Sequence, residues 1–306
     1  MIFQLKILGN NSAIPAHDRN QTSQLLQLDS RYVLIDCGEG TQIQLSNQKI
    51  RLNRIKTILI SHLHGDHYFG LIGLISTMHL FHRKHKLTVF APSELKKILA
   101  LQLKASETSL CFELEFIPLN HDGLMEIHRE EQFTIQSFPL EHGIKCYGFL
   151  IKETPKHWRI NKDKLPADML IQDIITLKKG ESVFDENGSI KYALDKYTLP
   201  PRPSRTYAYC SDTMYNEDII TYVQNVDLLY HESTFADEME ERAALTHHST
   251  ATQAATIAKK AKVHKLLLGH YSTRYKDPTP LLDEAKKVFD ETYLTHEGET
   301  FFLKEQ

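Results

Sequence analysis

The chain has 306 residues, 41% of them hydrophobic, which is enough for the core of one large or two ordinary domains. Its formal net charge of -3 excludes a generally basic nucleic-acid-binding protein, so any contact with RNA must depend on a local patch. The four cysteines are scattered without a CxxC pair, which argues against a disulfide scaffold and favours a reducing cytosol. The N-terminal sequence does not read as a signal peptide, and no apolar run approaches the roughly 20 residues of a membrane helix.

Short strands and helices alternate in the first half of the chain. Strands are expected at residues 2–8, 24–28, 31–36, 56–60, 87–91, 112–119, 131–140 and 146–151. Helices are expected within residues 37–45, 68–82 and 92–104.

Residues 152–196 interrupt this alternation. The segment is rich in Lys, Asp and Pro and weakly periodic, so we expect an inserted arm between a first half at residues 1–151 and a second half at residues 197–306. Residues 152–164 carry five basic and two acidic side chains, a patch that would suit an RNA backbone. Runs of charge are more often only a solvated surface.

Regular structure resumes after the arm. Strands are expected at residues 206–210, 227–233 and 265–270, helices at residues 250–261 and 278–290, and two short strands at the end. Alanines give the helix at residues 250–261 one small apolar face. Thr250 and Gln253 predict a capping box at its start.

A polar residue appears just where each of six apolar runs ends. These residues are Asp36, His62, His142, Asp212, His231 and His270. A fold that presents a site on loops held by a rigid scaffold produces this pattern.

Residues 62–67 hold the most specific pattern in the chain. His62, His64, Asp66 and His67 follow an apolar strand. Alternating residues of a loop project to one side, so two groups of ligands would face two neighbouring points. Imidazole nitrogen and carboxylate oxygen suit Zn²⁺, with Mn²⁺ or Fe as substitutes. A polar loop with chance histidines is the alternative, and the composition, spacing and context favour metal.

With these residues the chain resembles the metallo-β-lactamase superfamily over nearly its whole length, residues 152–196 excepted. The resemblance implies an α/β fold, a four-layer αββα sandwich with an inserted arm and with the metals at one edge of the two sheets. It also implies a ligand set for two metals. One metal takes His62, His64 and His142, the other takes Asp66, His67 and His270, and Asp212 bridges both.

Seven segments narrow the resemblance to ribonuclease Z, the endonuclease family that trims the 3′ trailer from precursor tRNA. In chain order they are LGNNSAIPAHDRNQTSQLL, DCGEGTQIQL, SHLHGDHYFGLIGLI, YCSDT, LLYHESTF, HSTATQAA and GHYSTRY. The resemblance implies two Zn²⁺ per subunit, with Mn²⁺ or another divalent metal as alternatives. It also implies precursor tRNA as partner, no membrane, and a cytoplasmic homodimer.

The implied reaction is hydrolysis of the phosphodiester after the discriminator base, by a water that the two zinc ions hold. It leaves a 3′-hydroxyl on the tRNA and a 5′-phosphate on the trailer. The family's arm usually has a glycine- and proline-rich run that grips the tRNA elbow. This chain departs from that pattern, because INKDKLPADMLIQDIITLKKGESV at residues 160–183 lacks the run.

The resemblance also implies catalytic roles. Asp66 is expected to act as general base as well as ligand. His248, oriented by Glu232, is expected to protonate or stabilise the leaving 3′ oxygen. The residues themselves suggest three further roles. Arg274, four residues after His270, is expected to reach a substrate phosphate, with a structural salt bridge as the alternative. Asp36 and His231 are expected to support ligands rather than bind metal.

Two other classes of function remain open at this point. The same centre would serve a phosphodiesterase of small or cyclic substrates or an arylsulfatase-like hydrolase, for which a closed pocket is expected instead of an open cleft. A non-catalytic RNA-binding or scaffold protein is the other class. The complete set of ligands argues against it.

Overall fold

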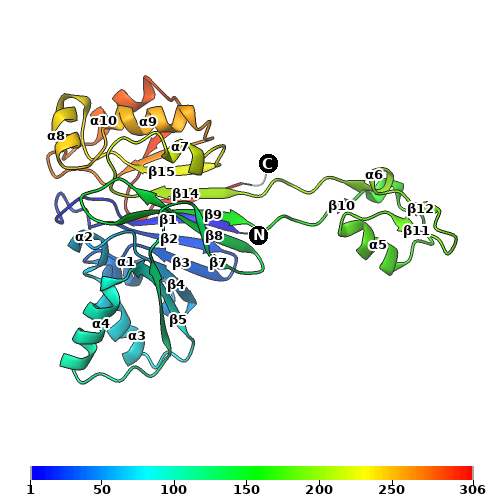
Figure 1. Ribbon diagram of the computed structural model, residues 1–306, viewed down its shortest axis with the longest axis horizontal. Helices are drawn as coiled ribbons and strands as arrows, with labels where there is room; N and C mark the ends of the chain where they lie inside the picture. The colour runs from blue at the N-terminus through cyan, green and yellow to red at the C-terminus, as the bar shows by residue number, and fades with distance from the viewer. Residues whose placement is uncertain (1, 305–306) are drawn as a thin grey trace. The chain divides into compact units, whose positions relative to one another are not determined.

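Two sheets pack against each other in the main unit of the chain, which comprises residues 2–152 and 206–303 (Figure 1). The computed structural model describes residues 2–304. In that range the first sheet has seven strands in the order β18–β1–β2–β3–β4–β5–β6, and the second has seven in the order β17–β16–β15–β14–β9–β8–β7. None of the described helices has the length and apolar character needed to cross a membrane.

The strands of the two sheets lie close to their predicted positions, except β7, which was not predicted. The first sheet contains β1 (Phe3–Gly9), β2 (Ser23–Leu28), β3 (Arg31–Ile35), β4 (Ile55–Leu59), β5 (Leu87–Pro92), β6 (Leu114–Leu119) and β18 (Thr300–Phe302). The second contains β7 (Met125–Arg129), β8 (Phe133–Leu140), β9 (Cys146–Glu153), β14 (Thr206–Cys210), β15 (Leu228–Glu232), β16 (Leu266–Gly269) and β17 (Thr292–Leu294). Strands β3 to β6 run parallel in one sheet and β14 to β17 in the other, so each set presents its carboxyl ends at one edge of its sheet.

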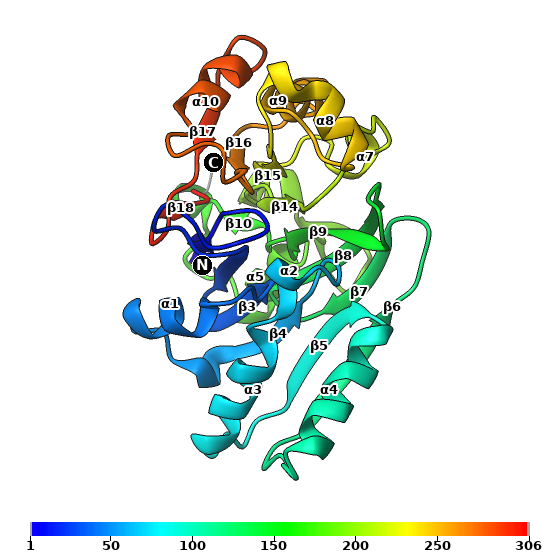
Figure 2. The same ribbon diagram turned by 90° about the vertical axis from the view of Figure 1, so that its left-hand side faces the viewer.

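Helices cover the outer face of each sheet, which confirms the predicted four-layer αββα sandwich (Figure 2). The first sheet is covered by α1 (Thr41–Asn47), α3 (Leu71–Leu80) and α4 (Glu94–Ala105), and the second by α7 (Ile219–Tyr222), α9 (Ala251–Lys260) and α10 (Thr279–Lys286). A third core fills the space between the sheets with side chains such as Leu26, Phe149, Tyr207 and Leu267. Burial of these apolar surfaces is the main force that holds the layers together.

The helix boundaries follow local signals in the sequence. The predicted capping box of α9 is confirmed, because the Thr250 side chain accepts from the Gln253 N–H and the Gln253 side chain accepts from the Thr250 N–H. The single helix predicted over residues 68–82 is wrong at its start. A one-turn helix, α2 (Gly65–Tyr68), ends just before Gly70, and α3 begins after it.

Residues Glu153–Arg205 form a second compact unit. It contains β10 (Arg159–Ile160), η2 (Lys162–Lys164), α5 (Ile171–Lys178), β11 (Val183–Phe184), β12 (Ile190–Tyr192), α6 (Leu194–Tyr197) and β13 (Thr198–Leu199). A small core of Leu177, Val183 and Tyr192 holds it together. Its weakly periodic sequence therefore folds into short elements with a core of their own.

A buried arginine links the end of α3 to the start of β4. The Arg83 side chain is 0% exposed, and burial lowers the pKa of its guanidinium below the usual value. It donates to four backbone carbonyl oxygens, those of Leu52, Ile55, His85 and Lys86. The guanidinium thereby joins the turn before β4 to the turn that follows α3.

We expect Arg83→Met to lower the free energy of unfolding by about 3 kcal/mol or more, because buried carbonyl oxygens lose their donors. Denaturant unfolding of the purified variant measures this loss. Lys84→Met is the matched control, since Lys84 is exposed, and its effect should stay within about 0.5 kcal/mol. Equal midpoints for the two variants would contradict this account of Arg83.

Candidate metal centre

The predicted ligands meet at one edge of the two sheets. Each follows the carboxyl end of a strand: His62 and His64 follow β4, His142 follows β8, Asp212 follows β14, and His270 follows β16. Asp66 and His67 lie in the one-turn helix α2. The expectation of an extended loop is therefore wrong for these last two residues.

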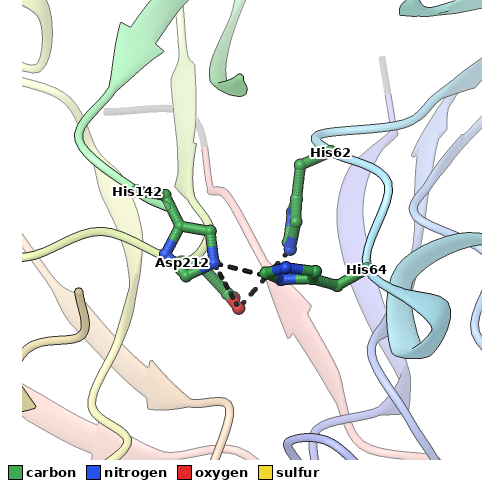
Figure 3. A group of neighbouring side chains, drawn as sticks. All are labelled: His62, His64, His142 and Asp212. Atoms are coloured by element: carbon green, nitrogen blue, oxygen red, sulfur yellow. Dashed lines mark hydrogen bonds and ion pairs between the residues drawn. The ribbon is translucent and has the colours of Figure 1, made fainter. Parts of the chain in front are cut away.

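Three histidines and one aspartate form the first ligand group. One ligand atom from each of His62, His64, His142 and Asp212 lies within 4.8 Å of the others. Figure 3 shows the four side chains pointing toward one another. His62 Nε2 lies 3.6 Å and His142 Nε2 3.8 Å from Asp212 Oδ2, and His142 Nε2 lies 3.1 Å from His64 Nδ1.

The second ligand group contains Asp66, His67 and His270. Asp66 Oδ2 lies 3.5 Å from His67 Nε2 and 3.4 Å from His270 Nε2. The other oxygen of Asp212, Oδ1, faces this group at 3.3 Å from His67 Nε2 and 3.2 Å from His270 Nε2. One carboxylate therefore presents one oxygen to each ligand group.

Neighbouring groups fix the orientation of the ligand rings through Nδ1. His67 Nδ1 lies 2.8 Å from Asp36 Oδ2, His142 Nδ1 2.8 Å from the His247 carbonyl oxygen, and His270 Nδ1 2.9 Å from Thr234 Oγ1. Each contact turns Nε2 toward the centre. Supporting contacts of this kind are typical of histidines that bind metal.

Close packing of the backbone holds α2 against the loop after β3. A Cβ on Gly38 would lie 2.4 Å from the Asp66 carbonyl oxygen, so only glycine fits there. The Cys37 N–H donates to the His67 carbonyl oxygen at 2.7 Å, and the Gly70 N–H donates to the Cys37 carbonyl oxygen at 2.9 Å. The glycines of DCGEG and HGDHYFG therefore allow the two loops to meet.

The residues present fit a pair of divalent cations. His62 Nε2 is buried without a hydrogen-bond partner among the described residues, and a metal would use its lone pair. Burial lowers the pKa of His62, which keeps the ring neutral as a ligand must be. Burial would also lower the pKa of His67, but Asp212, Asp66 and Asp36 outweigh it and raise that pKa well above its usual value. This concentration of negative charge favours cations.

A buried glutamate holds His248 beside the ligand groups. Glu232 Oε1 accepts from His248 Nδ1 at 2.8 Å, as predicted, and from the Thr213 N–H at 3.1 Å. Burial would lower the pKa of His248, but the charge and hydrogen bond of Glu232 raise it to about 9. Glu232 thus favours the protonated form of His248, with Nδ1 committed to the carboxylate.

Two other predicted residues lie outside the ligand groups. Arg274 follows β16 and lines an open hollow that His248 also lines. His231 is buried on β15, with Nδ1 2.7 Å from the Glu232 carbonyl oxygen.

Sequence reasoning missed several supporting groups. They are the Ala13 N–H, which donates to Asp66 Oδ2, the hydroxyls of Ser61, Tyr209 and Thr234, and Arg242, which lines the same hollow as Arg274.

Known proteins resemble this chain over much or all of its length. A family model described as anti-Pycsar protein Apyc1 matches residues 3–187. Ribonuclease Z of Cytophaga hutchinsonii is 49% identical over 306 residues, which cover 100% of this chain and 98% of that protein.

Solved structures share the fold. Human tRNase Z, short form, has a TM-score of 0.70 at 24% identity, over 97% of this chain and 98% of that one. The metallo-β-lactamase fold protein YhfI of Bacillus subtilis has a TM-score of 0.70 at 19% identity, over 99% and 100% of the two chains. With 49% identity to a curated relative along its whole length, the chain belongs to the ribonuclease Z family, on the metallo-β-lactamase fold.

Proposed function

We propose that this chain is a metal-dependent endoribonuclease that removes the 3′ trailer from precursor tRNA. Relatives named ribonuclease Z and the fold shared with tRNase Z support the substrate class. The observation that carries the chemistry is the position of Asp212, whose two oxygens face two separate ligand groups. A bimetallic centre is the arrangement that such a carboxylate serves.

We assign the seven ligand residues to two metal ions. His62, His64 and His142 would bind one ion, Asp66, His67 and His270 the other, and Asp212 would bind both. Nitrogen and oxygen donors of this kind suit Zn²⁺, and Mn²⁺ or another divalent ion is an alternative. When bound, the two ions would activate a water and polarise the phosphodiester.

In this proposal Asp66 takes a proton. Its Oδ2 receives the Ala13 N–H at 2.8 Å and faces both His67 and His270. Its other oxygen, Oδ1, would accept the proton of the attacking water, so one carboxylate would act as ligand and general base.

In this proposal His248 gives a proton. Its Nδ1 is held by Glu232, so Nε2 is the atom that would donate to the leaving 3′ oxygen. Arg274 would bind a phosphate of the substrate with its planar guanidinium.

The second unit is the proposed tRNA-binding arm. Its Lys156 and Arg205 both contact Glu153, so part of its positive charge is neutralised internally. Arg159, Lys162 and Lys164 add further positive charge near its start, which would favour a phosphate backbone. The homodimer and the cytoplasmic location that the family resemblance implies stay predictions.

The test of the proposed function is cleavage of a 3′-extended precursor tRNA by the zinc-loaded protein, with both product ends mapped. We expect a cut directly after the discriminator base, a 3′-hydroxyl on the tRNA and a 5′-phosphate on the trailer. Asp66→Ala should abolish the cut, because it removes the proton acceptor and a ligand. Hydrolysis of bis(p-nitrophenyl) phosphate without any cut in the tRNA would instead support a small-ester phosphodiesterase.

Asp212→Ala should lower bound metal from about two ions per chain to about one or fewer, because both groups share this ligand. Metal analysis of the dialysed protein measures the ratio. Asp227→Ala is a matched control, since Asp227 lies on the chain segment before β15 and outside the ligand groups. Two ions per chain in Asp212→Ala would refute a bridging role.

His248→Ala should lower kcat on precursor tRNA by about 10²–10⁴-fold, the usual contribution of a general acid, while the metal content is retained. His247→Asn is the control, because it keeps the backbone carbonyl that accepts from His142, and asparagine tolerates the φ of 54° at this residue. Loss of metal in His248→Ala, or an equal loss of kcat in His247→Asn, would contradict the assignment of His248 as the proton donor.

A further inference from the structure

The hollow beside His248 has a volume of about 470 Å³ and is open to solvent. Its walls come from the loops after β1, β15 and β16 and from α8 (Glu240–Leu245). It is continuous with the proposed site of proton transfer, because His248 forms part of its lining.

The lining of this hollow is positively charged. Among the described residues it includes two guanidinium groups, Arg242 and Arg274, and no carboxylate. Hydroxyl groups of Thr246 and Ser272 lie in the same lining. Guanidinium forks match the oxygens of a phosphate group, whereas the Thr246 hydroxyl already donates to the Arg242 carbonyl oxygen at 2.8 Å. Phe235 also lines the hollow but is only 6% exposed, so it offers little surface for stacking a base.

Arg242 and His248 belong to one rigid piece of backbone. Within α8 and the turn that ends it, the Thr246 N–H donates to the Arg242 carbonyl oxygen at 3.0 Å, and the His248 N–H donates to the Ala243 carbonyl oxygen at 2.8 Å. Ala243 is fully buried and anchors this turn. The distance between the backbones of Arg242 and His248 is therefore set by the fold, which is a requirement for a group that positions a substrate.

The chemistry of the cut determines which part of the substrate adjoins His248. Cleavage that leaves a 3′-hydroxyl on the tRNA breaks the bond to the 3′ oxygen of the last retained nucleotide. A proton donor at that oxygen must lie on the side of the retained nucleotide. The hollow next to His248 then receives that nucleotide, and the phosphate on its 5′ side is the next anion along the chain.

We propose that Arg242 binds the phosphate on the 5′ side of the last nucleotide that the tRNA retains, and so positions the scissile bond against His248. This inference rests on the proposed function for the polarity of the cut. Arg242 is a positioning residue in this scheme, because it contacts the substrate away from the reacting atoms.

The test measures binding rather than cleavage. The ligand is an RNA minihelix that ends in the 3′-hydroxyl of the discriminator nucleotide. One form of this RNA is unmodified, and the other carries a neutral methylphosphonate in place of the phosphate on the 5′ side of that nucleotide. The affinity of each RNA for the metal-loaded protein is measured. Arg242→Ala should weaken binding of the unmodified RNA about tenfold, as expected for one charge-assisted contact. The methylphosphonate should weaken binding to the unaltered protein by a similar factor.

The two changes together should weaken binding no more than either alone, because both remove the same contact. A methylphosphonate one phosphate further along should add its effect to that of Arg242→Ala. Lys259→Ala, which removes an exposed cation from α9, should leave the affinity and the response to the methylphosphonate unchanged. The proposal would be overturned if the losses of affinity from Arg242→Ala and from the methylphosphonate next to the discriminator nucleotide were additive. Unchanged affinity in Arg242→Ala would also overturn it.

This experiment separates the inference from the proposed function. The coupling between Arg242 and the phosphate is measured from binding affinities alone, so its outcome does not depend on whether the RNA is cleaved. Failure to cut precursor tRNA would contradict the proposed function and leave a measured coupling in place.

Discussion

The buried carboxylate of Asp36 joins the two sheets at the edge where the ligands meet. It is 0% exposed and accepts from the Ser61 N–H at 2.7 Å, Ser61 Oγ at 2.8 Å and Tyr209 OH at 2.6 Å, besides its contact with His67. Ser61 follows β4 of the first sheet, and Tyr209 lies on β14 of the second. A buried carboxylate without such donors costs several kcal/mol, so this network fixes β3, β4 and β14 relative to one another. Asp36 has a positive φ of 54°, a strained backbone conformation that these hydrogen bonds maintain.

Glu232 has the corresponding role on the other side of the centre. Its Oε2 accepts from the Thr234 N–H at 3.0 Å and Thr234 Oγ1 at 2.7 Å, and the same hydroxyl contacts His270 Nδ1. Its Oε1 holds His248. One buried carboxylate thus orients a ligand ring through a hydroxyl and the proposed proton donor directly. Removing Glu232 would therefore disturb metal binding and proton transfer together, whereas removing the His248 ring would affect proton transfer and leave the ligand His270 in place.

Most strands, most helices and the polar residues at the strand ends could be predicted from simple periodicity, whereas the four-layer fold came from family resemblance. Apolar runs mark the strands, and the residue after each run must lie at a strand end. Six strand ends carry His or Asp, so these residues were expected to form one site, and the structure brings Asp212 close to both His62 and His270. The assignment of ligands to two metals came from family resemblance. Neither spacing nor composition alone would divide seven residues into two groups.

The parts that escaped prediction have no periodic signal. Strand β7 is an edge strand whose five residues are all at least partly exposed, so it lacks the apolar alternation of the others. The Ala13 N–H is a backbone donor whose position depends on the path of the loop after β1. Arg242 is an exposed cation on a short helix, a setting in which most arginines only meet solvent. The role proposed for Arg242 depends on the hydrogen bond from the His248 N–H to the Ala243 carbonyl oxygen, which fixes His248 to the same turn. Sequence patterns report which residues are buried, whereas a residue that acts on a substrate from the surface is defined by what the fold places beside it.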